Sequence, residues 1–467
     1  MYKQLLALCL LVLYVNIALL CCYLQTDTPF AFATWASGIL WLNSLPIAHY
    51  ILKGHKRELF PFIPILGFFV IVSYSLPVFF ITPSSYEVAP LTETALAYSF
   101  LGYFTFYCIY FSLCGLFIFR RGFNVIRIPI EDFKIRLVAL FFLAINVFTV
   151  KIFRMPSFSY IGAAGIYFYL GTYLYLTEMK VKISFVEKLI YYFVLAEELL
   201  AGFISGQLAG LALLILYLCI ILFILGKRFG KIFFLSFVFL VFFYFFVPIK
   251  YKYRVETWFS TKEYTTFEKV QLVLELMMDP SNYDRNKIPQ KYHARMNLLW
   301  RPSYDASALS LVTSKTPNEV PFWNGETYII LPKLIPRIFW ADKPTEDASL
   351  NYAIKYGLVP PTKKVSPFPL PVLAEMYMNY GQKGIIIGMM LLAILYCIFN
   401  GYFNNSKITG VGRIYSIAII FQFIYHEGNL TMTFGNIPLL ILSIYFICRL
   451  LQYPSFVRTK SIQFVQR

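Results

Sequence analysis

The feature that most constrains this 467-residue chain is a series of apolar runs, each about 20 residues long, which is the length a helix needs to cross a bilayer. The chain is 59% hydrophobic and only 14% charged, whereas an ordinary soluble domain is about a quarter charged. So few charges cannot cover the surface of a soluble globule of this size. The sequence therefore excludes a soluble enzyme, a disordered protein and a disulfide scaffold.

The apolar runs predict an all-α, polytopic integral membrane protein with about twelve transmembrane helices. We expect these helices at residues 5–24, 30–52, 61–82, 95–119, 136–153, 157–177, 185–205, 206–226, 231–249, 383–403, 411–427 and 434–452. Alternate connections are rich in lysine and arginine, while the short loops at 25–29 and 83–94 carry acidic charges only. Because basic loops stay on the cytoplasmic side, both termini are expected in the cytoplasm.

One long segment interrupts this pattern. Residues 250–372 hold 13 of the 25 prolines, 17 lysines and arginines and 12 acidic residues, with no apolar span. The alternation puts this segment on the outer side, and loops of this length cross whatever their charge. The predicted division is therefore spans one to nine, a large outer loop of short helices, and spans ten to twelve with a cytoplasmic tail: 1–249, 250–372 and 373–467.

The large loop contains one clear amphipathic pattern. Phe267, Val270, Leu274 and Met277 recur at the spacing of one helix face. We expect this helix to rest on the membrane domain or at its interface with water.

The charge pattern and the missing motifs limit the ligands that we expect this chain to bind. The formal net charge is +17, but most basic residues lie in cytoplasmic loops and act as orientation signals, so no nucleic-acid partner is expected. The sequence has no phosphate-binding glycine loop, no Asp-x-Asp pair and no metal-ligand spacing of histidines or cysteines. We therefore expect neither a metal nor a cofactor.

The basic residues expected on the outer side are the candidate anion ligands. Arg154 and Lys151 occupy a short outer loop where basic residues are disfavoured, so Arg154 is either an anion ligand or a snorkelling arginine at a helix end. Arginine suits phosphate because its planar fork donates two parallel hydrogen bonds. The large loop adds further candidates, which are alternatively a solvated basic surface: Arg254, Arg295, Arg301, Arg337 and Lys343.

Three residues are candidate general bases. Glu375 lies just before the tenth predicted span, where an apolar border would raise its pKa and let it accept a proton. It is alternatively a structural partner of a loop arginine. His293 in the large loop and His426 at the outer end of the eleventh span are the other candidates.

Two adjacent acids fall inside an apolar run. Glu197 and Glu198 lie in the seventh predicted span, and acids within a membrane segment usually mark a function or a buried partner. Since no basic partner helix is evident, they are a weak indication of a transporter.

Two strings in the second half of the chain resemble a known family. GETYIILPKLIPRIFWADKP and LAEMYMNYGQKGIIIG, together with the helix layout, resemble the Wzy-type oligosaccharide repeat-unit polymerases of bacterial O-antigen, capsule and exopolysaccharide. The pattern runs from a Gly-Glu-x-Tyr turn through Pro336-Arg337 and Lys343 to Glu375-x-Tyr377-x-Asn379-Tyr380-Gly381. It covers residues 325–384, and the rest of the chain matches in helix layout only.

The resemblance implies a glycosyltransferase related to the GT-C class, in the bacterial inner membrane with its active face in the periplasm. Such an enzyme transfers the growing glycan from undecaprenyl diphosphate to the end sugar of a new lipid-linked repeat unit, without a metal. A chain-length regulator and a flippase in the same membrane are the further partners that it implies. Arg337 and Lys343 are then expected near the site, Arg154 in an earlier outer loop, and Glu375 and Tyr377 at the helix border.

Two other functions remain open at this point. An O-antigen ligase, which passes the glycan to lipid A–core, shares the architecture, although the Glu-x-Tyr-x-Asn-Tyr-Gly string favours the polymerase. A transporter or flippase for lipid-linked glycans would need inverted repeats or a charged cavity through the membrane. A basic outer loop of 123 residues fits such a transporter poorly.

Overall fold

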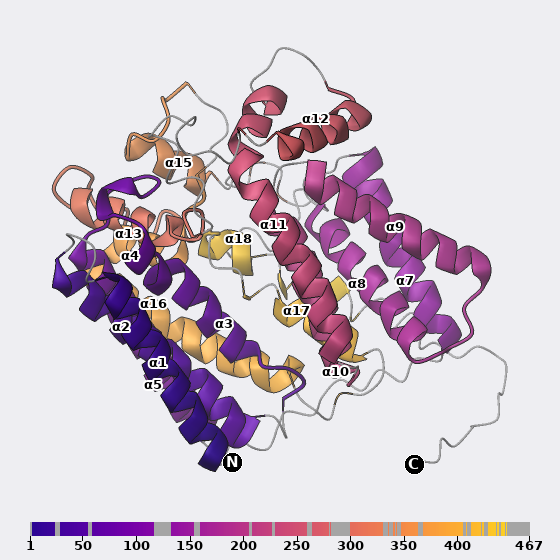
Figure 1. Ribbon diagram of the computed structural model, residues 1–467, viewed down its shortest axis with the longest axis horizontal. Coiled ribbons are helices and arrows are strands. Elements are labelled where there is room, and N and C mark those ends of the chain that lie inside the picture. The colour runs from indigo at the N-terminus through magenta and orange to yellow at the C-terminus, as the bar shows by residue number, and fades with distance from the viewer. Residues whose placement is uncertain are drawn as a thin grey trace.

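The computed structural model describes helical elements throughout the chain (Figure 1). All regular elements among the described residues are helices, which confirms the predicted all-α class. The described residues are 2–23, 29–54, 58–115, 132–153, 159–204, 208–226, 229–258, 264–279, 281, 299–329, 335, 340, 342, 347–362, 368–404, 408, 412–421, 423–424, 428–435, 437–438, 440–443 and 445.

The N-terminal helices form one bundle with a helix from the C-terminal part. Its members are α1 (Tyr2–Tyr23), α2 (Phe30–His49), α3 (Phe62–Val70), α4 (Leu76–Phe80), α5 (Glu93–Gly115) and α16 (Val372–Phe403). The π-helical turns η1 (Tyr50–Gly54) and η2 (Ile71–Ser75) continue α2 and α3, and the short turn η3 (Pro83–Ser85) follows α4. Since α5 packs along both α2 and α16, residues from both halves of the chain share this core (Figure 1).

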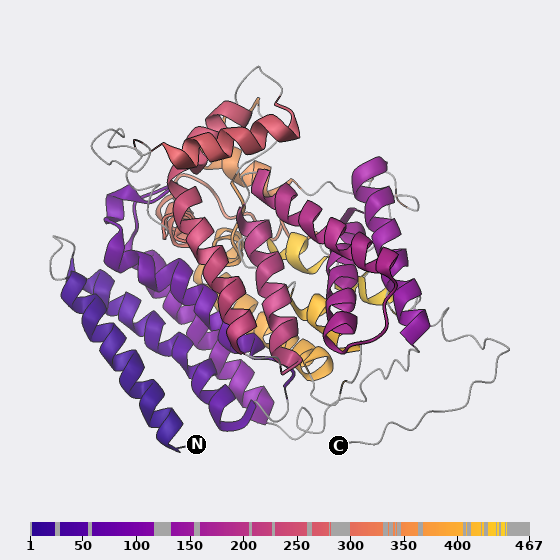
Figure 2. The ribbon, with the colours of Figure 1, turned by 45° about the vertical axis from the view of Figure 1, so that its right-hand side comes forward.

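A second group of helices lies beside this bundle (Figure 2). It consists of α7 (Asp132–Asn146) with η4 (Val147–Ile152), α8 (Ser159–Glu178), α9 (Phe185–Ile204), α10 (Leu208–Ile224), α11 (Phe229–Trp258) and α17 (Gly412–Phe421). The helix α8 packs against α7, α10 and α17, and α17 also contacts α16. The C-terminal part of the chain therefore connects the two groups.

Among the described residues, five helical segments are long and apolar enough to cross a membrane, as expected for a helical membrane protein. They are Phe30–Leu52, Phe62–Phe80, Glu93–Leu113, Lys134–Ile152 and Val372–Phe403. Shorter apolar helices lie at Leu5–Cys21, Gly210–Ile224, Phe234–Val247 and Gly412–Phe421.

The large predicted loop begins as a continuation of α11 rather than as a new segment. The helix α11 runs through the expected boundary at residue 249 and ends at Trp258, and α12 (Thr266–Met278) follows across its outer end (Figure 2). A capping box starts α12: Thr265 Oγ1 accepts the Glu268 N–H, and Glu268 Oε2 accepts the Thr265 N–H.

The amphipathic helix predicted around residues 267–277 is thus confirmed as α12, and the residues of its predicted apolar face divide between packed and exposed positions. Val273 is buried and Met277 packs with it against α11. Phe267 and Leu274 point outward instead, with exposures of 78% and 47%. Contact of the exposed residues with the membrane interface stays a prediction.

Another part of the predicted loop enters the first bundle. The helix α13 (Tyr304–Lys315) packs against α5, α16 and η2, and its residues 304–312 are all buried. Ala306, Ser307 and Ala308 are small enough to let the neighbouring helices approach closely. The loop also contributes α15 (Ala348–Lys355), while the short helix α18 (Leu430–Phe434) belongs to the C-terminal part.

The opposite end of α16 is fixed by a buried amide network. Asn404 Oδ1 accepts the N–H groups of Leu59 and Phe60, both at 3.0 Å, and Asn404 Nδ2 donates to Phe60 O at 2.9 Å. One turn earlier, Asn400 Nδ2 donates to Glu58 Oε1 at 3.0 Å. These bonds hold the connection between α2 and α3 against the end of α16.

Candidate functional site

Four of the ten predicted site residues fall among the described residues: Arg254, Arg301, Glu375 and Tyr377. The other six lie outside them and stay predictions: Arg154, His293, Arg295, Arg337, Lys343 and His426. The four described residues divide into two groups, an arginine cluster formed by the end of α11 and the turn before α13, and a junction within α16.

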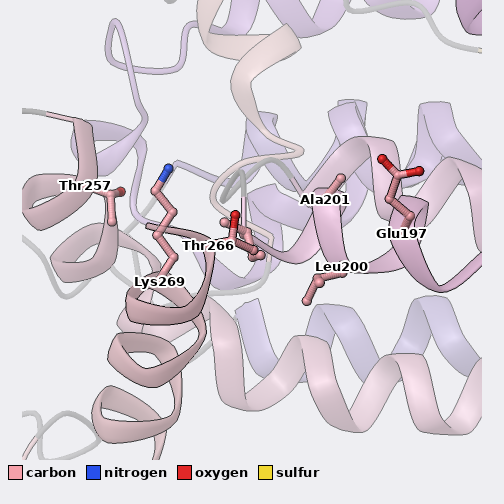
Figure 3. A pocket seen from close by; sticks show the side chains of 7 residues that line it. Glu197, Leu200, Ala201, Thr257, Thr266 and Lys269 are labelled. Atoms are coloured by element: carbon pink, nitrogen blue, oxygen red, sulfur yellow. The ribbon is translucent and has the colours of Figure 1, made fainter. Parts of the chain in front are cut away.

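A pocket of about 360 Å³ between α9, α11 and α12 contains none of these four residues (Figure 3). Its lining consists of Glu197, Leu200, Ala201, Ile204, Thr257, Thr266 and Lys269. The four described site residues therefore lie outside this pocket.

The two described arginines come together although they are distant in the sequence. Arg254 lies near the end of α11, within the helix rather than in a loop, and Arg301 lies in the turn before α13. Burial lowers the pKa of Arg254, and the charge of Arg301 lowers this pKa further, whereas the charge of Glu87 raises it. Two guanidinium groups and one carboxylate thus share one electrostatic environment, which we call the arginine cluster.

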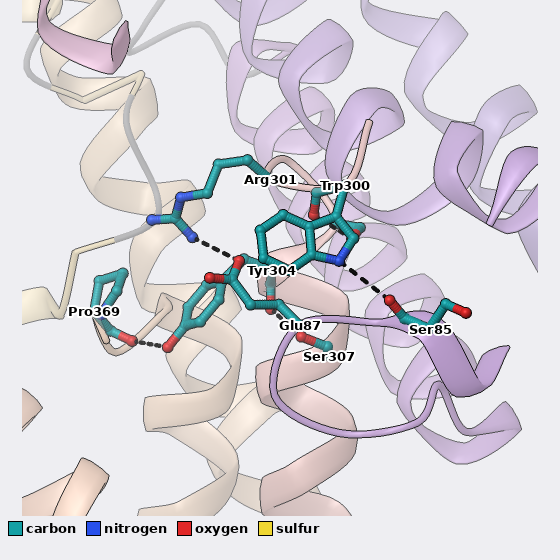
Figure 4. Close-up of polar contacts among 8 residues, drawn as sticks. Ser85, Glu87, Trp300, Arg301, Tyr304, Ser307 and Pro369 are labelled. Atoms are coloured by element: carbon teal, nitrogen blue, oxygen red, sulfur yellow. Dashed lines mark hydrogen bonds and ion pairs between the residues drawn. The ribbon is translucent and has the colours of Figure 1, made fainter. Parts of the chain in front are cut away.

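Arg301 contacts both Glu87 and the ring of Tyr304 within the arginine cluster (Figure 4). Its Nη1 lies 3.5 Å from Glu87 Oε2, with 37% of its side chain exposed. Its guanidinium carbon lies 4.7 Å from the ring centroid of Tyr304, a cation–π contact. The Tyr304 hydroxyl donates to Pro369 O at 2.6 Å, so the ring under Arg301 is held in place.

The neighbouring Trp300 fixes the loop that carries Glu87. Its indole Nε1 donates to Ser85 O at 3.1 Å (Figure 4). This hydrogen bond therefore connects the segment that carries Arg301 to the loop that carries Glu87, close to the two charged groups. Sequence reasoning did not select Glu87, although an acid in a short outer loop is the expected counter-charge for outer arginines.

The two strings that carry the family resemblance meet in a junction. Asn379 Nδ2 donates to Thr327 Oγ1 at 2.9 Å and to Glu375 O at 2.8 Å, and Asn379 Oδ1 accepts the Gly325 N–H at 2.8 Å. Asn379 is completely buried. Residues 323–328 are thereby bound to the first half of α16, and we call this contact the turn–helix junction.

Glu375 lies before the tenth span predicted at 383–403, as expected, because a kink at Tyr380 and Gly381 divides α16 into two helical segments. The helix begins at Val372, so Glu375 is in its first turn, with no exposed surface. Its Oε2 accepts the N–H of Leu430 at 2.6 Å. The carboxylate therefore joins α16 to the start of α18, and this geometry favours a positioning role over direct contact with an outer substrate.

The backbone of α16 bends next to the junction. Tyr380 and Gly381 depart from helical geometry, and Gly381 has a φ of +60°, a conformation that favours glycine. Gly325, in the facing turn, has a φ of +93° and is so close to Tyr380 that an added Cβ would lie 2.6 Å from its hydroxyl oxygen. The turn that begins at Gly325 thus packs closely against the kink at Tyr380 and Gly381.

Tyr377 and Tyr328 are aromatic residues of the two segments that meet at the turn–helix junction, and they carry hydroxyl groups near it. Tyr377 is 9% exposed and its ring centroid is 5.1 Å from that of Tyr98 on α5. Burial raises the pKa of Tyr328, and the nearby charge of Glu375 raises this pKa further. Both phenols are therefore neutral hydroxyl groups at neutral pH and can serve as hydrogen-bond donors.

The acidic pair in the seventh predicted span has a basic partner, contrary to the sequence interpretation. Lys151 Nζ lies 2.5 Å from Glu197 Oε1 and 3.6 Å from Glu198 Oε1. The partner was missed because Lys151 lies in the last turn of a π-helical segment, η4, at the border of a different predicted span.

Comparison with known proteins gives one match. A family profile described as "Domain of unknown function (DUF8712)" covers residues 57–459, most of the chain. Neither the curated proteins nor the solved structures contain a match to this sequence.

Proposed function

The chain belongs to the DUF8712 family, and we propose that it is a membrane glycosyltransferase that polymerises lipid-diphosphate-linked oligosaccharide repeat units, as the Wzy-type polymerases do. The observation that carries this proposal is the arginine cluster. Arg254 and Arg301 come from separate segments and share Glu87 as a counter-charge. Guanidinium groups from two segments suit a phosphate-bearing ligand, because each can donate parallel hydrogen bonds to phosphate oxygens.

The topology proposed from the sequence gives the arginine cluster a location. With twelve spans and cytoplasmic termini, the end of α11 and the loop that carries Glu87 both lie on the periplasmic side. A lipid diphosphate in the outer leaflet would have its charged groups at the same depth in the membrane as the arginine cluster. The GT-C-like layout and the inner-membrane location are part of this proposal.

The cluster would act on the leaving group of the reaction. In the proposed transfer, a hydroxyl of the acceptor sugar attacks the anomeric carbon of the donor glycan, and the bond from that carbon to the diphosphate oxygen breaks. Negative charge grows on the departing undecaprenyl diphosphate, and preorganised arginines stabilise this charge. The hydroxyl proton passes to a general base, and His293 and His426 remain candidates for this role.

The turn–helix junction would hold the surrounding segments in position. Asn379 and Glu375 bind the turn and the start of α18 to the same stretch of α16. Of the described residues there, Tyr377 and Tyr328 are the proposed glycan contacts, because aromatic rings offer an apolar face and a hydroxyl together.

One observation favours a second candidate function. The ion cluster of Lys151, Glu197 and Glu198 lies among helices of the second group, and paired charges within membrane helices are typical of transport pathways. Under this alternative the chain would move lipid-linked glycans across the membrane without lengthening them.

The experiment compares chain extension by matched variants of the purified full-length protein in proteoliposomes. Arg254→Ala and Arg301→Ala should each lower extension by about 10-fold or more, given the energy of a charge-assisted hydrogen bond. Arg136→Ala is the control, since Arg136 Nη1 also lies 3.5 Å from a glutamate, Glu187, at the predicted cytoplasmic side. Equal polymer lengths in all three variants would contradict the proposal.

A further inference from the structure

The pocket between α9, α11 and α12 is built for a ligand with two opposite charges. Figure 3 shows the carboxylate of Glu197 and the ammonium group of Lys269 on the same side of the pocket, with the Thr266 hydroxyl between them. Leu200 points to the opposite side (Figure 3). The pocket thus has a polar side with a positive and a negative group, and an apolar side.

The charges around the pocket are balanced. Glu197 and Glu198 face Lys151 at 2.5 and 3.6 Å, and Lys269 adds a second positive charge at the pocket. A purely anionic ligand could pair with Lys269 but would bring its charge toward Glu197, and a purely cationic ligand could pair with Glu197, which already contacts Lys151, but would face Lys269. A zwitterion can satisfy the two groups together.

The helices around the pocket carry large apolar side chains on their outer surfaces. On α9, Phe193 is 69% exposed and Leu200, which also lines the pocket, is 41% exposed. On α11, Val241 and Tyr244 are 39% and 63% exposed. Such surfaces on membrane helices face lipid, so the molecules with the readiest access to the pocket are phospholipids.

From these observations we propose that the pocket binds the headgroup of a phospholipid that carries both a phosphate and a primary ammonium group. Lys269 and the Thr266 hydroxyl would donate to the phosphate, and Glu197 would accept from the ammonium group. Leu200, Ala201 and Ile204 would contact the glycerol and the upper acyl chains. This binding site is independent of the arginine cluster and of the proposed reaction.

The test measures lipid binding by the full-length protein in detergent micelles, using native mass spectrometry. Phosphatidylethanolamine and phosphatidylglycerol with identical acyl chains are the probes. Wild-type protein should bind phosphatidylethanolamine about 10-fold more tightly than phosphatidylglycerol. Lys269→Ala should remove most of the phosphatidylethanolamine binding, because charge-assisted hydrogen bonds are stronger than neutral ones. Glu197→Gln should weaken phosphatidylethanolamine binding and leave phosphatidylglycerol binding unchanged.

Two variants separate loss of the pocket from other effects. Lys188→Ala removes an exposed lysine from the start of α9, away from the pocket lining, and should bind both lipids as the wild type does. Lys151→Met removes the ion-pair partner of Glu197 and should keep the preference for phosphatidylethanolamine. Equal binding of the two lipids by the wild type, or equal binding by Lys269→Ala and Lys188→Ala, would overturn the proposal.

Discussion

Asn379 Nδ2 donates to Thr327 Oγ1 at 2.9 Å, and this bond links the outer turn to α16 in a fully buried position. The same side chain accepts from Gly325 N and donates to Glu375 O. A buried amide that uses its oxygen and both hydrogens is a strong constraint, because water cannot replace the lost partners. The turn and the first half of α16 therefore form one structural unit.

Replacing Asn379 by alanine should destabilise the protein markedly. The change leaves Gly325 N–H and Thr327 Oγ1 without this buried partner, and we expect a loss of about 2–4 kcal/mol. Thermal unfolding in detergent is the measurement, with Asn351→Ala on the exposed surface of α15 as the control. An equal melting temperature for the two variants would contradict the assigned role.

Gly325→Ala should destabilise the turn for two reasons that can be separated. The added Cβ would lie 2.6 Å from the Tyr380 hydroxyl oxygen, and the φ of +93° is unfavourable for alanine. Tyr380→Phe removes the clashing oxygen and leaves the backbone conformation as it is. The double variant should therefore recover part of the lost stability in thermal unfolding, and no recovery would mean that the contact with Tyr380 is not limiting.

Removing the counter-charge of the arginine cluster should strengthen the binding of diphosphate. Glu87→Gln leaves Arg301 and Arg254 in place and removes the acid that lies 3.5 Å from Arg301. We expect inhibition of chain extension by free undecaprenyl diphosphate to become about 3- to 10-fold tighter, as expected for one charge at a partly exposed site. Weaker inhibition would show that Glu87 orients Arg301 more than it neutralises it.

Glu58 should make the stability of the protein pH-dependent. Burial raises the pKa of Glu58 from 4.5 to about 7, although the hydrogen bond from Asn400 partly opposes this rise. The folded protein then keeps the proton up to about pH 7, whereas the unfolded chain releases it near pH 4.5. The contribution of Glu58 to the free energy of unfolding is thus fully present below pH 4.5 and is lost as the pH rises to 7.

The measurement for Glu58 is the melting temperature between pH 4.5 and 7 for the wild type and for Glu58→Gln. Glutamine keeps the oxygen that accepts from Asn400 Nδ2 but carries no charge, so its melting temperature should vary less over this range. Identical pH profiles for the two proteins would show that Glu58 is not the titrating group.

The helical class and the positions of several elements could be predicted from the length of the apolar runs and from helical periodicity. The span expected at 95–119 is α5 at Glu93–Gly115, and the amphipathic helix expected near 267–277 is α12. The span expected at 383–403 is the part of α16 after its kink at Tyr380 and Gly381. Hydropathy did not predict the helical segment that begins at Val372, because its Glu375 and Asn379 are polar residues whose groups are satisfied inside the fold.

The candidate site could be predicted only in part, for a similar reason. Arg254 and Arg301 were selected by residue type, and their proximity depends on packing between α11 and the segment before α13, which no sequence spacing reveals. Asn379 lies one helical turn after Glu375, and that spacing was the available signal for the turn–helix junction. The acid Glu87 and the pairing of Lys151 with Glu197 are contacts between distant segments, which periodicity along one helix cannot predict.

The most direct measurement of the central claim is the in vitro extension of defined lipid-linked repeat units by the purified full-length protein, followed by linkage analysis of the product. The account predicts a ladder of products that differ by one repeat unit, formed without added metal or nucleotide sugar and with release of undecaprenyl diphosphate. Transfer only to lipid A–core would indicate a ligase. Movement of the substrate across the bilayer with no lengthening would contradict the glycosyltransferase account.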